Sequence, residues 1–209
     1  HRIALETGEL FVVQELATDG EAVRWSPDGR FAAYEVETPE GIVTRLVRVL
    51  DGSTEAVAEL PGGGLAFSPA GSTAAYLSVD RSPEFEAQRA ELEAEFGETD
   101  RASRRRLRAE LSTLEARHTR AILRNLDNGA ETVARPNGVL VTSLLFSPDG
   151  SLHALAAPDA MESGEEAVMA GNPQIFRLDQ DGSATALSTG PGPKSDPFFA
   201  GDGEYLVYG

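Results

Sequence analysis

A five-residue turn motif recurs along the chain and constrains its fold more than any other feature. It consists of an aromatic residue, Ser-Pro, Asp or Ala, and Gly, and its full copies occupy residues 25–29, 67–71 and 146–150, with a weaker copy at 199–203. Proline presets φ for the first corner of a type I turn, Asp suits the next position, and Gly takes the left-handed position from which the strand re-pairs. Apolar runs flank every copy. Each copy therefore predicts a β-hairpin.

A second pattern follows each of the three full motifs. In residues 46–60, 122–134 and 175–187, an alternating apolar run leads through Leu-Asp and a glycine-bearing turn into another alternating run. Such a pattern predicts a further hairpin with one buried face. Four strands per repeat is typical of β-propeller blades.

The spacing of the motifs agrees with this interpretation. Trp25 and Phe67 are 42 residues apart, and a four-stranded blade takes about 40–45 residues. The next two intervals are 79 and 53 residues, and segments of different composition, residues 82–118 and 159–170, account for their extra length.

The two ends of the chain resemble complementary halves of a blade. Residues 1–16 have the pattern of a second half, and residues 196–209 that of a first half. The sequence therefore predicts an all-β fold, a β-propeller of four blade equivalents. Either the halves pair to close a small ring, or the chain is a slice of a larger ring, since propellers have about 4–8 blades. We expect the slice, because the last strand stops at Gly209.

Residues 82–118 are predicted to form an α-helical hairpin inserted in the second full blade. Ser82 and Pro83 are typical of a helix start, apolar residues then recur at helical spacing, and Gly97 can end the first helix. Residues 84–98 hold six acidic residues and one arginine, whereas residues 101–117 hold six arginines and two glutamates. Two antiparallel helices of opposite charge attract each other along their length.

The candidate partner-binding residues are four arginines of the second helix: Arg104, Arg105, Arg106 and Arg108. They either pair with the glutamates of the first helix or dock a partner protein. A nucleic acid is disfavoured, because the chain carries a net charge of −16 and phosphate binding needs a basic face. The expected partner is a protein or peptide, which includes the remainder of a longer parent chain.

Composition and motifs exclude several kinds of site. The chain has no cysteine, so disulfides and thiolate metal sites are excluded, and it has no apolar window of about 20 residues for membrane insertion. Asp28 and Asp149 are interpreted as turn formers, and His153 as an ordinary strand residue. Carboxylate groups without the spacing of a calcium loop are interpreted as solvated turns: Asp179 with Asp181, and Glu162 with Glu165 and Glu166. We therefore predict no catalytic residue, no metal site and no cofactor.

The sequence Trp-Ser-Pro-Asp-Gly-Arg at residues 25–30, followed by Phe-Ala-Ala-Tyr at residues 31–34, resembles the WD-repeat-like propeller repeats of TolB-like proteins. The same repeat occurs in the N-terminal propellers of prolyl-oligopeptidase-type serine peptidases. The resemblance covers nearly the whole chain except the two insertions, and it implies one of two functions. The first is a propeller that gates substrate entry to a peptidase. The second is a free-standing protein-binding module of the bacterial envelope, which favours a periplasmic or secreted location.

The catalytic half of such a peptidase is missing from the sequence. The family's nucleophile lies in a Gly-x-Ser-x-Gly turn on a separate domain, and this chain contains no such pentapeptide. We therefore expect a non-catalytic scaffold that contacts another protein or domain.

Overall fold

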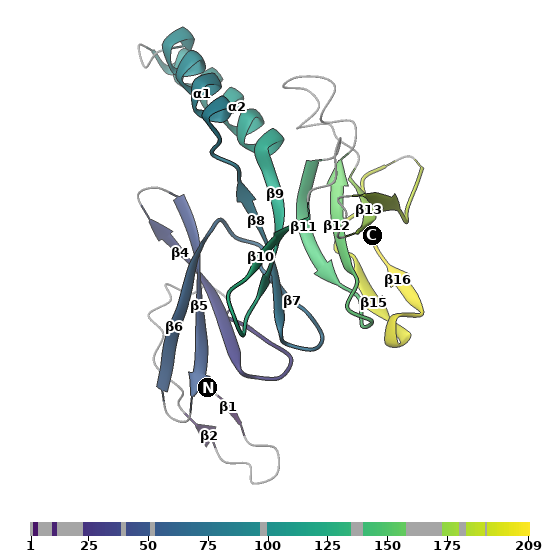
Figure 1. Ribbon diagram of the computed structural model, residues 1–209. Helices are drawn as coiled ribbons and strands as arrows, with labels where there is room; N and C mark the ends of the chain where they lie inside the picture. Colours follow the sequence, from purple (N-terminus) through teal and green to yellow (C-terminus); the bar gives the residue numbers. More distant parts are fainter. Residues whose placement is uncertain are drawn as a thin grey trace.

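The computed structural model describes residues 2–3, 10–11, 23–38, 41–50, 53–96, 100–134, 140–157, 173–179, 183–190 and 192–209. Their strands form three four-stranded and two two-stranded antiparallel sheets, which are arranged as an open arc (Figure 1). The first complete sheet contains β3 (Arg24–Trp25), β4 (Phe31–Thr38), β5 (Gly41–Leu50) and β6 (Ser53–Pro61). The second contains β7 (Ala66–Phe67), β8 (Thr73–Val79), β9 (Thr119–Asn125) and β10 (Glu131–Val133). The third contains β11 (Leu140–Phe146), β12 (Leu152–Ala157), β13 (Gln174–Leu178) and β14 (Ala184–Ala186).

Within each complete sheet, consecutive strands are hydrogen-bonded neighbours. This order confirms the predicted four-stranded blades. The turn motif joins the first two strands of each blade, and its glycine has a positive φ: 70° at Gly29, 72° at Gly71 and 86° at Gly150. An L-residue side chain is disfavoured in that region, which explains why glycine stands there.

The third hairpin differs from the first two by one residue. Ser26 N–H donates to the carbonyl of Phe31, whereas Ser147 N–H donates to the carbonyl of Ser151, one position earlier in the motif. A shift of one residue moves each side chain to the opposite face of the sheet. His153 therefore faces the sheet that follows the third blade, although Ala74, at the same motif position, faces the preceding blade.

The blades pack through two apolar clusters. Phe31 and Ala33 of the first blade contact Ala74 and Tyr76 of the second. Ala75 of the second blade belongs to the other cluster, which it shares with the third blade. Strand β8 is thus buried on both faces, and its alanines allow neighbouring sheets to approach closely.

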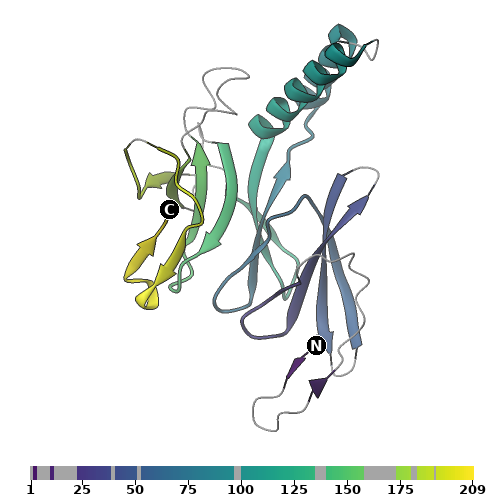
Figure 2. The same ribbon diagram turned by 180° about the vertical axis from the view of Figure 1, so that it is seen from behind.

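The two-stranded sheets lie at the ends of the arc (Figures 1 and 2). One pairs β1 (Arg2–Ile3) with β2 (Leu10–Phe11), and the other pairs β15 (Phe198–Ala200) with β16 (Tyr205–Val207). Because these pairs belong to separate sheets, the end strands do not close the described arc into a four-bladed ring.

The weaker motif also forms a hairpin, between β15 and β16, but through a different turn. Ala200 replaces the serine, and a short 3-10 turn, Gly201–Gly203, brings Asp202 to a φ of 54°. The hydroxyl that supports the other turns is missing at this position.

Two helices lie between β8 and β9. They are α1 (Pro83–Phe96) and α2 (Arg101–His118), and they run side by side away from the second blade (Figures 1 and 2). We call this pair the arm. None of the helices in the described part of the chain combines the length and the apolar character needed to cross a membrane.

Candidate functional site

The arm is fixed to the second blade at its base. The strand pairing of β8 with β9 reaches Val79 opposite Thr119, and the next backbone bond runs from Asp80 N–H to the carbonyl of His118 at 2.8 Å. Asp80 also forms an ion pair with Arg120. Because these contacts continue the sheet directly into the arm, they fix where the helices emerge from the blade.

Both helices begin at a capping side chain. Ser82 Oγ accepts a hydrogen bond from Phe85 N–H at 3.3 Å. Asp100 Oδ1 accepts from Ala102 N–H at 2.7 Å and from Ser103 N–H at 2.9 Å, and these bonds lower the pKa of Asp100. The caps satisfy N–H groups that have no partner inside the helix.

The helices share a small apolar interior. Within α1, which is described throughout, Phe85 is buried and its ring meets that of His118 edge-on, with centroids 5.3 Å apart. Within α2, Leu107, Thr113 and Leu114 are buried. The interior is too small to cover the remaining apolar side chains, and Leu111 stays partly exposed.

A groove of about 490 Å³ runs along one side of the arm. Its lining consists of Arg89, Glu93, Arg104, Leu107, Arg108 and Leu111. The two leucines form an apolar floor, and three of the four charged residues are arginines. Arg89 Nε pairs with Glu93 Oε1 at 2.9 Å, which partly neutralises the α1 side. The α2 side therefore carries the positive charge of this groove, which we call the arginine groove.

The four predicted arginines are all exposed, and the structure divides them into two pairs. Arg104 and Arg108, one helical turn apart, line the arginine groove, whereas Arg105 and Arg106 do not. Among the described residues, no carboxylate forms an ion pair with any of the four. The interpretation that they pair directly with α1 is therefore not supported in the described part of the arm.

The other side of the arm carries the opposite charge. A smaller groove of about 210 Å³ is lined by Gln88, Glu91, Leu92, Glu95, Glu110, Thr113, Leu114 and Arg117. Three carboxylates and one arginine give this side a negative balance. The charge difference between the two helices, read from the sequence, is thus accompanied by a charge difference between the linings of the two grooves.

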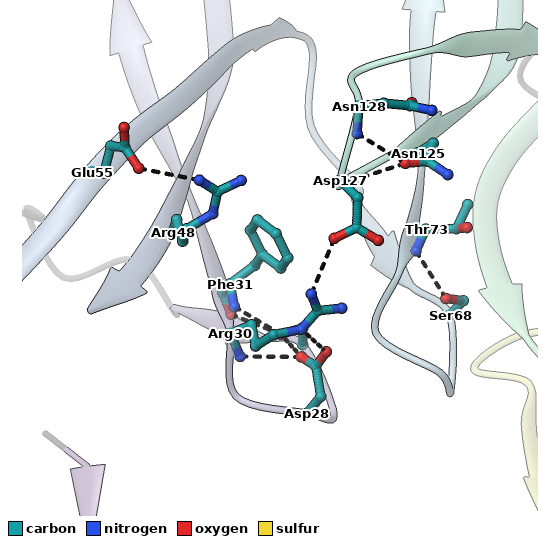
Figure 3. A network of polar contacts seen from close by, with 11 residues as sticks. Asp28, Arg30, Phe31, Arg48, Glu55, Ser68, Thr73, Asn125, Asp127 and Asn128 are labelled. Carbon is teal, nitrogen blue, oxygen red and sulfur yellow. Dashed lines mark hydrogen bonds and ion pairs between the residues drawn. The ribbon is translucent and has the colours of Figure 1, made fainter. Parts of the chain in front are cut away.

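The aspartates of the turn motif are held by structural hydrogen bonds. Ser26 Oγ donates to Asp28 Oδ1 at 2.7 Å. Arg30 Nε contacts Asp28 Oδ2 at 2.6 Å (Figure 3). Burial acts to raise the pKa of Asp28, but the bonds from Ser26 and Arg30 outweigh it and lower that pKa. Hydrogen bonds from Ser147 and Ser151 lower the pKa of Asp149 to about 2. Carboxylates held ionised in this way are poor general acids or bases near neutral pH.

Arg30 also joins two blades. Its Nη1 pairs with Asp127 Oδ1 at 3.0 Å, in the turn after β9, while its Nε holds Asp28 in the first blade (Figure 3). Asp127 belongs to a turn in which Asn125 Oδ1 accepts the N–H groups of Asp127 and Asn128. The guanidinium groups of Arg30 and Arg48 both lie over the ring of Phe31, within 5.6 Å of its centroid. This network links the first two blades.

His153 is a buried packing residue on β12. Its ring meets Phe199 edge-on with centroids 4.8 Å apart, and its Nδ1 lies 3.1 Å from the carbonyl of Ser151. Burial lowers the pKa of His153. In the described parts of the chain, no group of three His, Cys, Asp or Glu side chains is placed to hold a metal ion.

Several candidates from the sequence lie outside the described residues. They are Glu162, Glu165, Glu166 and Asp181, the insertion at residues 159–170, and His1. Sequence reasoning missed Arg89, which joins the arginine groove from the acidic helix. In the sequence, Arg89 stands out as the one arginine among the six acidic residues of positions 84–98. Only the packing of the two helices shows that it lies on the same side of the arm as Arg104 and Arg108.

Comparison with known proteins identifies the fold. No family model and no curated protein sequence matches the chain. Among solved structures, TolB from Acinetobacter baumannii is similar with a TM-score of 0.55 and 15% identity, over 90% of this chain and 36% of that protein. The tricorn protease is similar with a TM-score of 0.51 and 15% identity, over 99% of this chain and 22% of that protein.

These similarities confirm the predicted TolB-like β-propeller repeats as a fold. The chain spans about a third of the length of the TolB structure from Acinetobacter baumannii. At such low identity these similarities establish the architecture alone. They do not assign the activity of TolB or of the tricorn protease to this chain.

Proposed function

We propose that the chain is a non-catalytic β-propeller module that binds another protein, and that the arginine groove of the arm is its contact surface. The observation that carries this proposal is the placement of Arg104 and Arg108. Both are exposed without an ion pair among the described residues, and both flank an apolar floor of Leu107 and Leu111. The fixed base of the arm holds this surface away from the blades.

The chemistry of the groove favours an acidic partner with apolar side chains. A guanidinium group donates several hydrogen bonds in a fork that matches a carboxylate, and it can remain close to apolar surface. Arginine is also enriched among the few interface residues that contribute most of the binding energy. An amphipathic segment carrying Glu or Asp beside Leu or Phe would satisfy both parts of the groove.

The proposal has a more specific form, in which the propeller gates substrate access to a prolyl-oligopeptidase-like serine peptidase. The similarity to the tricorn protease supports it, since that protein combines this fold with a protease. The similarity to TolB supports the alternative of a free-standing binding module of the bacterial envelope. Reading the gene beyond the codon for Gly209 separates the two, because the peptidase form requires a Gly-x-Ser-x-Gly turn downstream.

The arm is tested with two labelled helical peptides, one of Glu, Leu and Ala and one of Lys, Leu and Ala. We expect the acidic peptide to bind in a fluorescence anisotropy titration, and more weakly as salt is added. The double variant Arg104→Glu, Arg108→Glu should weaken this binding by about tenfold or more, because it replaces attraction with repulsion.

The matched control is Arg101→Glu, Arg105→Glu. It makes the same charge change at the same spacing on α2 but leaves the lining of the arginine groove intact. We expect its affinity to stay close to that of the unmodified chain. Equal loss of binding in both double variants, or binding of the basic peptide as tight as the acidic one, would contradict the proposed contact surface.

A further inference from the structure

The smaller groove on the other side of the arm, which we call the acidic groove, is complementary in charge to the arginine groove. Its three carboxylates are those of Glu91, Glu95 and Glu110. Among the described residues, none of these carboxylates forms an ion pair. Leu92, which also lines this groove, is partly exposed. The acidic groove therefore presents Glu beside Leu, which is the chemistry that the arginine groove favours.

The charged pairs of the two grooves have the same spacing. Arg104 and Arg108 are four residues apart on α2, and Glu91 and Glu95 are four residues apart on α1. Because an α-helix rises 1.5 Å per residue, each pair is separated by about 6 Å along its helix. When such helices lie side by side, two guanidinium groups can face two carboxylates at once.

Both pairs lie in the half of the arm that is far from the blade. The arm leaves the sheet at Asp80 and His118, whereas the two glutamates are near the end of α1 and the two arginines near the start of α2. The two grooves are on different sides of one arm, so they do not meet within one copy of the chain. Two arms that overlap at their outer halves bring the grooves together and keep the blades apart (Figure 1).

We propose that the arginine groove of one copy of the chain binds the acidic groove on the arm of a second copy. This inference rests on the proposed function, because it names the partner of the same arginine groove. The contact joins two different surfaces, so each pair of copies retains one groove of each kind. Association therefore continues beyond two copies, as an open series or until it closes into a ring.

Repulsion between whole copies opposes this contact, because each copy carries a net charge of −16. At about 0.1 M salt the Debye length is about 10 Å, so the long-range repulsion is largely screened while charges in direct contact still attract. The test is the mean mass in solution at that salt concentration, measured by light scattering over a concentration series. We expect the mass to rise with concentration above that of one chain, 22.2 kDa, and to fall back as salt approaches about 1 M.

Charge reversal on either side of the contact should weaken the association. Arg104→Glu, Arg108→Glu and Glu91→Arg, Glu95→Arg should each raise the dissociation constant by about tenfold or more, because like charges then face each other. The second variant has a smaller net negative charge than the unmodified chain, so repulsion between whole copies does not explain its loss of association. The variant with all four substitutions has the original net charge and should associate again, because its grooves are complementary with the signs exchanged.

The matched control is Arg101→Glu, Arg105→Glu, which changes the charge of α2 outside both grooves and should associate as the unmodified chain does. Circular dichroism confirms that each variant is folded. A constant mass of one chain, a pair that adds no third copy, or no recovery in the variant with four substitutions would overturn this inference. If the unmodified chain keeps the mass of one copy but still binds the acidic peptide, the proposed function holds and only the second copy as partner is wrong.

Discussion

At the scale of single residues, the hydroxyl of Ser26 holds the first turn together. It accepts a hydrogen bond from Phe31 N–H at 2.9 Å, donates to Asp28, and is buried. Ser26→Ala removes both bonds, so we expect urea unfolding to show a loss of about 1–3 kcal/mol in the free energy of unfolding. The control is Ser53→Ala at an exposed position of β6, where a change within about 0.5 kcal/mol is usual. Equal effects of the two substitutions would contradict this role.

The turn carboxylates make stability depend on acid pH. The folded pKa of Asp149 is about 2, below the unfolded value of about 3.9. Its stabilising contribution is therefore complete above about pH 4 and is lost as the pH falls towards about 2. We expect the free energy of urea unfolding to fall over that range, and to fall less in Asp149→Asn. Ser147→Ala removes the main cause of the lowered pKa and should move the fall to higher pH. An unchanged pH profile in both variants would show that another group is responsible.

Two glycines of the same motif differ in what surrounds them. A Cβ at Gly150 would meet nothing within 4 Å, whereas a Cβ at Gly71 would overlap the Asp28 carboxyl group of the neighbouring blade. Both have a positive φ, so Gly150→Ala should cost about 1–2 kcal/mol from backbone strain alone. Gly71→Ala should cost more in urea unfolding, and the additional substitution Asp28→Ala should recover part of the difference. Equal losses in the free energy of unfolding for the two glycine variants would mean that the turn at Gly71 does not contact Asp28 of the neighbouring turn.

At the scale of elements, the arm can be separated from the blade that bears it. Val79 and Thr119 are paired neighbours on β8 and β9, so a short Asn-Gly turn can replace residues 82–118. We expect the shortened chain to keep a single cooperative thermal transition and a strand-rich circular dichroism spectrum. Loss of the transition would show that Leu107 and Leu114 belong to the core of the blades.

The hairpins could be predicted from the sequence because the residues that determine each of them are close together in the sequence. Ser, Pro, Asp or Ala, and Gly within five residues define each of the three full turns, and alternation defines each buried face. The contact between Gly71 and Asp28 could not be predicted, because it joins turns of different blades. The one-residue shift in the pairing of the third hairpin could not be predicted from the sequence either, because residues 146–150 match the first motif at every position except the aromatic one.

The arginine groove was predictable only in part. The four arginines and their exposed character followed from the charge pattern of residues 101–117, as did the alternative that they pair with α1. Which of them line a groove depends on how α2 is rotated against α1. Since Phe85 is the one buried side chain of the fully described α1, the apolar pattern of that helix fixes the rotation weakly.

At the scale of the whole molecule, the net charge of −16 opposes the compact state. Added salt screens this repulsion, but it also weakens exposed ion pairs such as Arg30–Asp127, each of which contributes about 0–1 kcal/mol. We expect repulsion to dominate, because it acts between all the excess acidic groups, so sodium chloride should raise the thermal midpoint. A rise of about 2–4 °C corresponds to about 1 kcal/mol for a chain of this length.

The salt dependence identifies the cause of that rise. Screening acts mainly between about 0.01 and 0.1 M, where the Debye length falls from about 30 to about 10 Å. Stabilisation by solute exclusion grows instead with sulfate concentration and does not level off in that range. A midpoint that rises and then levels off in sodium chloride therefore reports repulsion. A midpoint that falls would mean that the ion pairs linking the blades contribute more to stability than the excess negative charge removes.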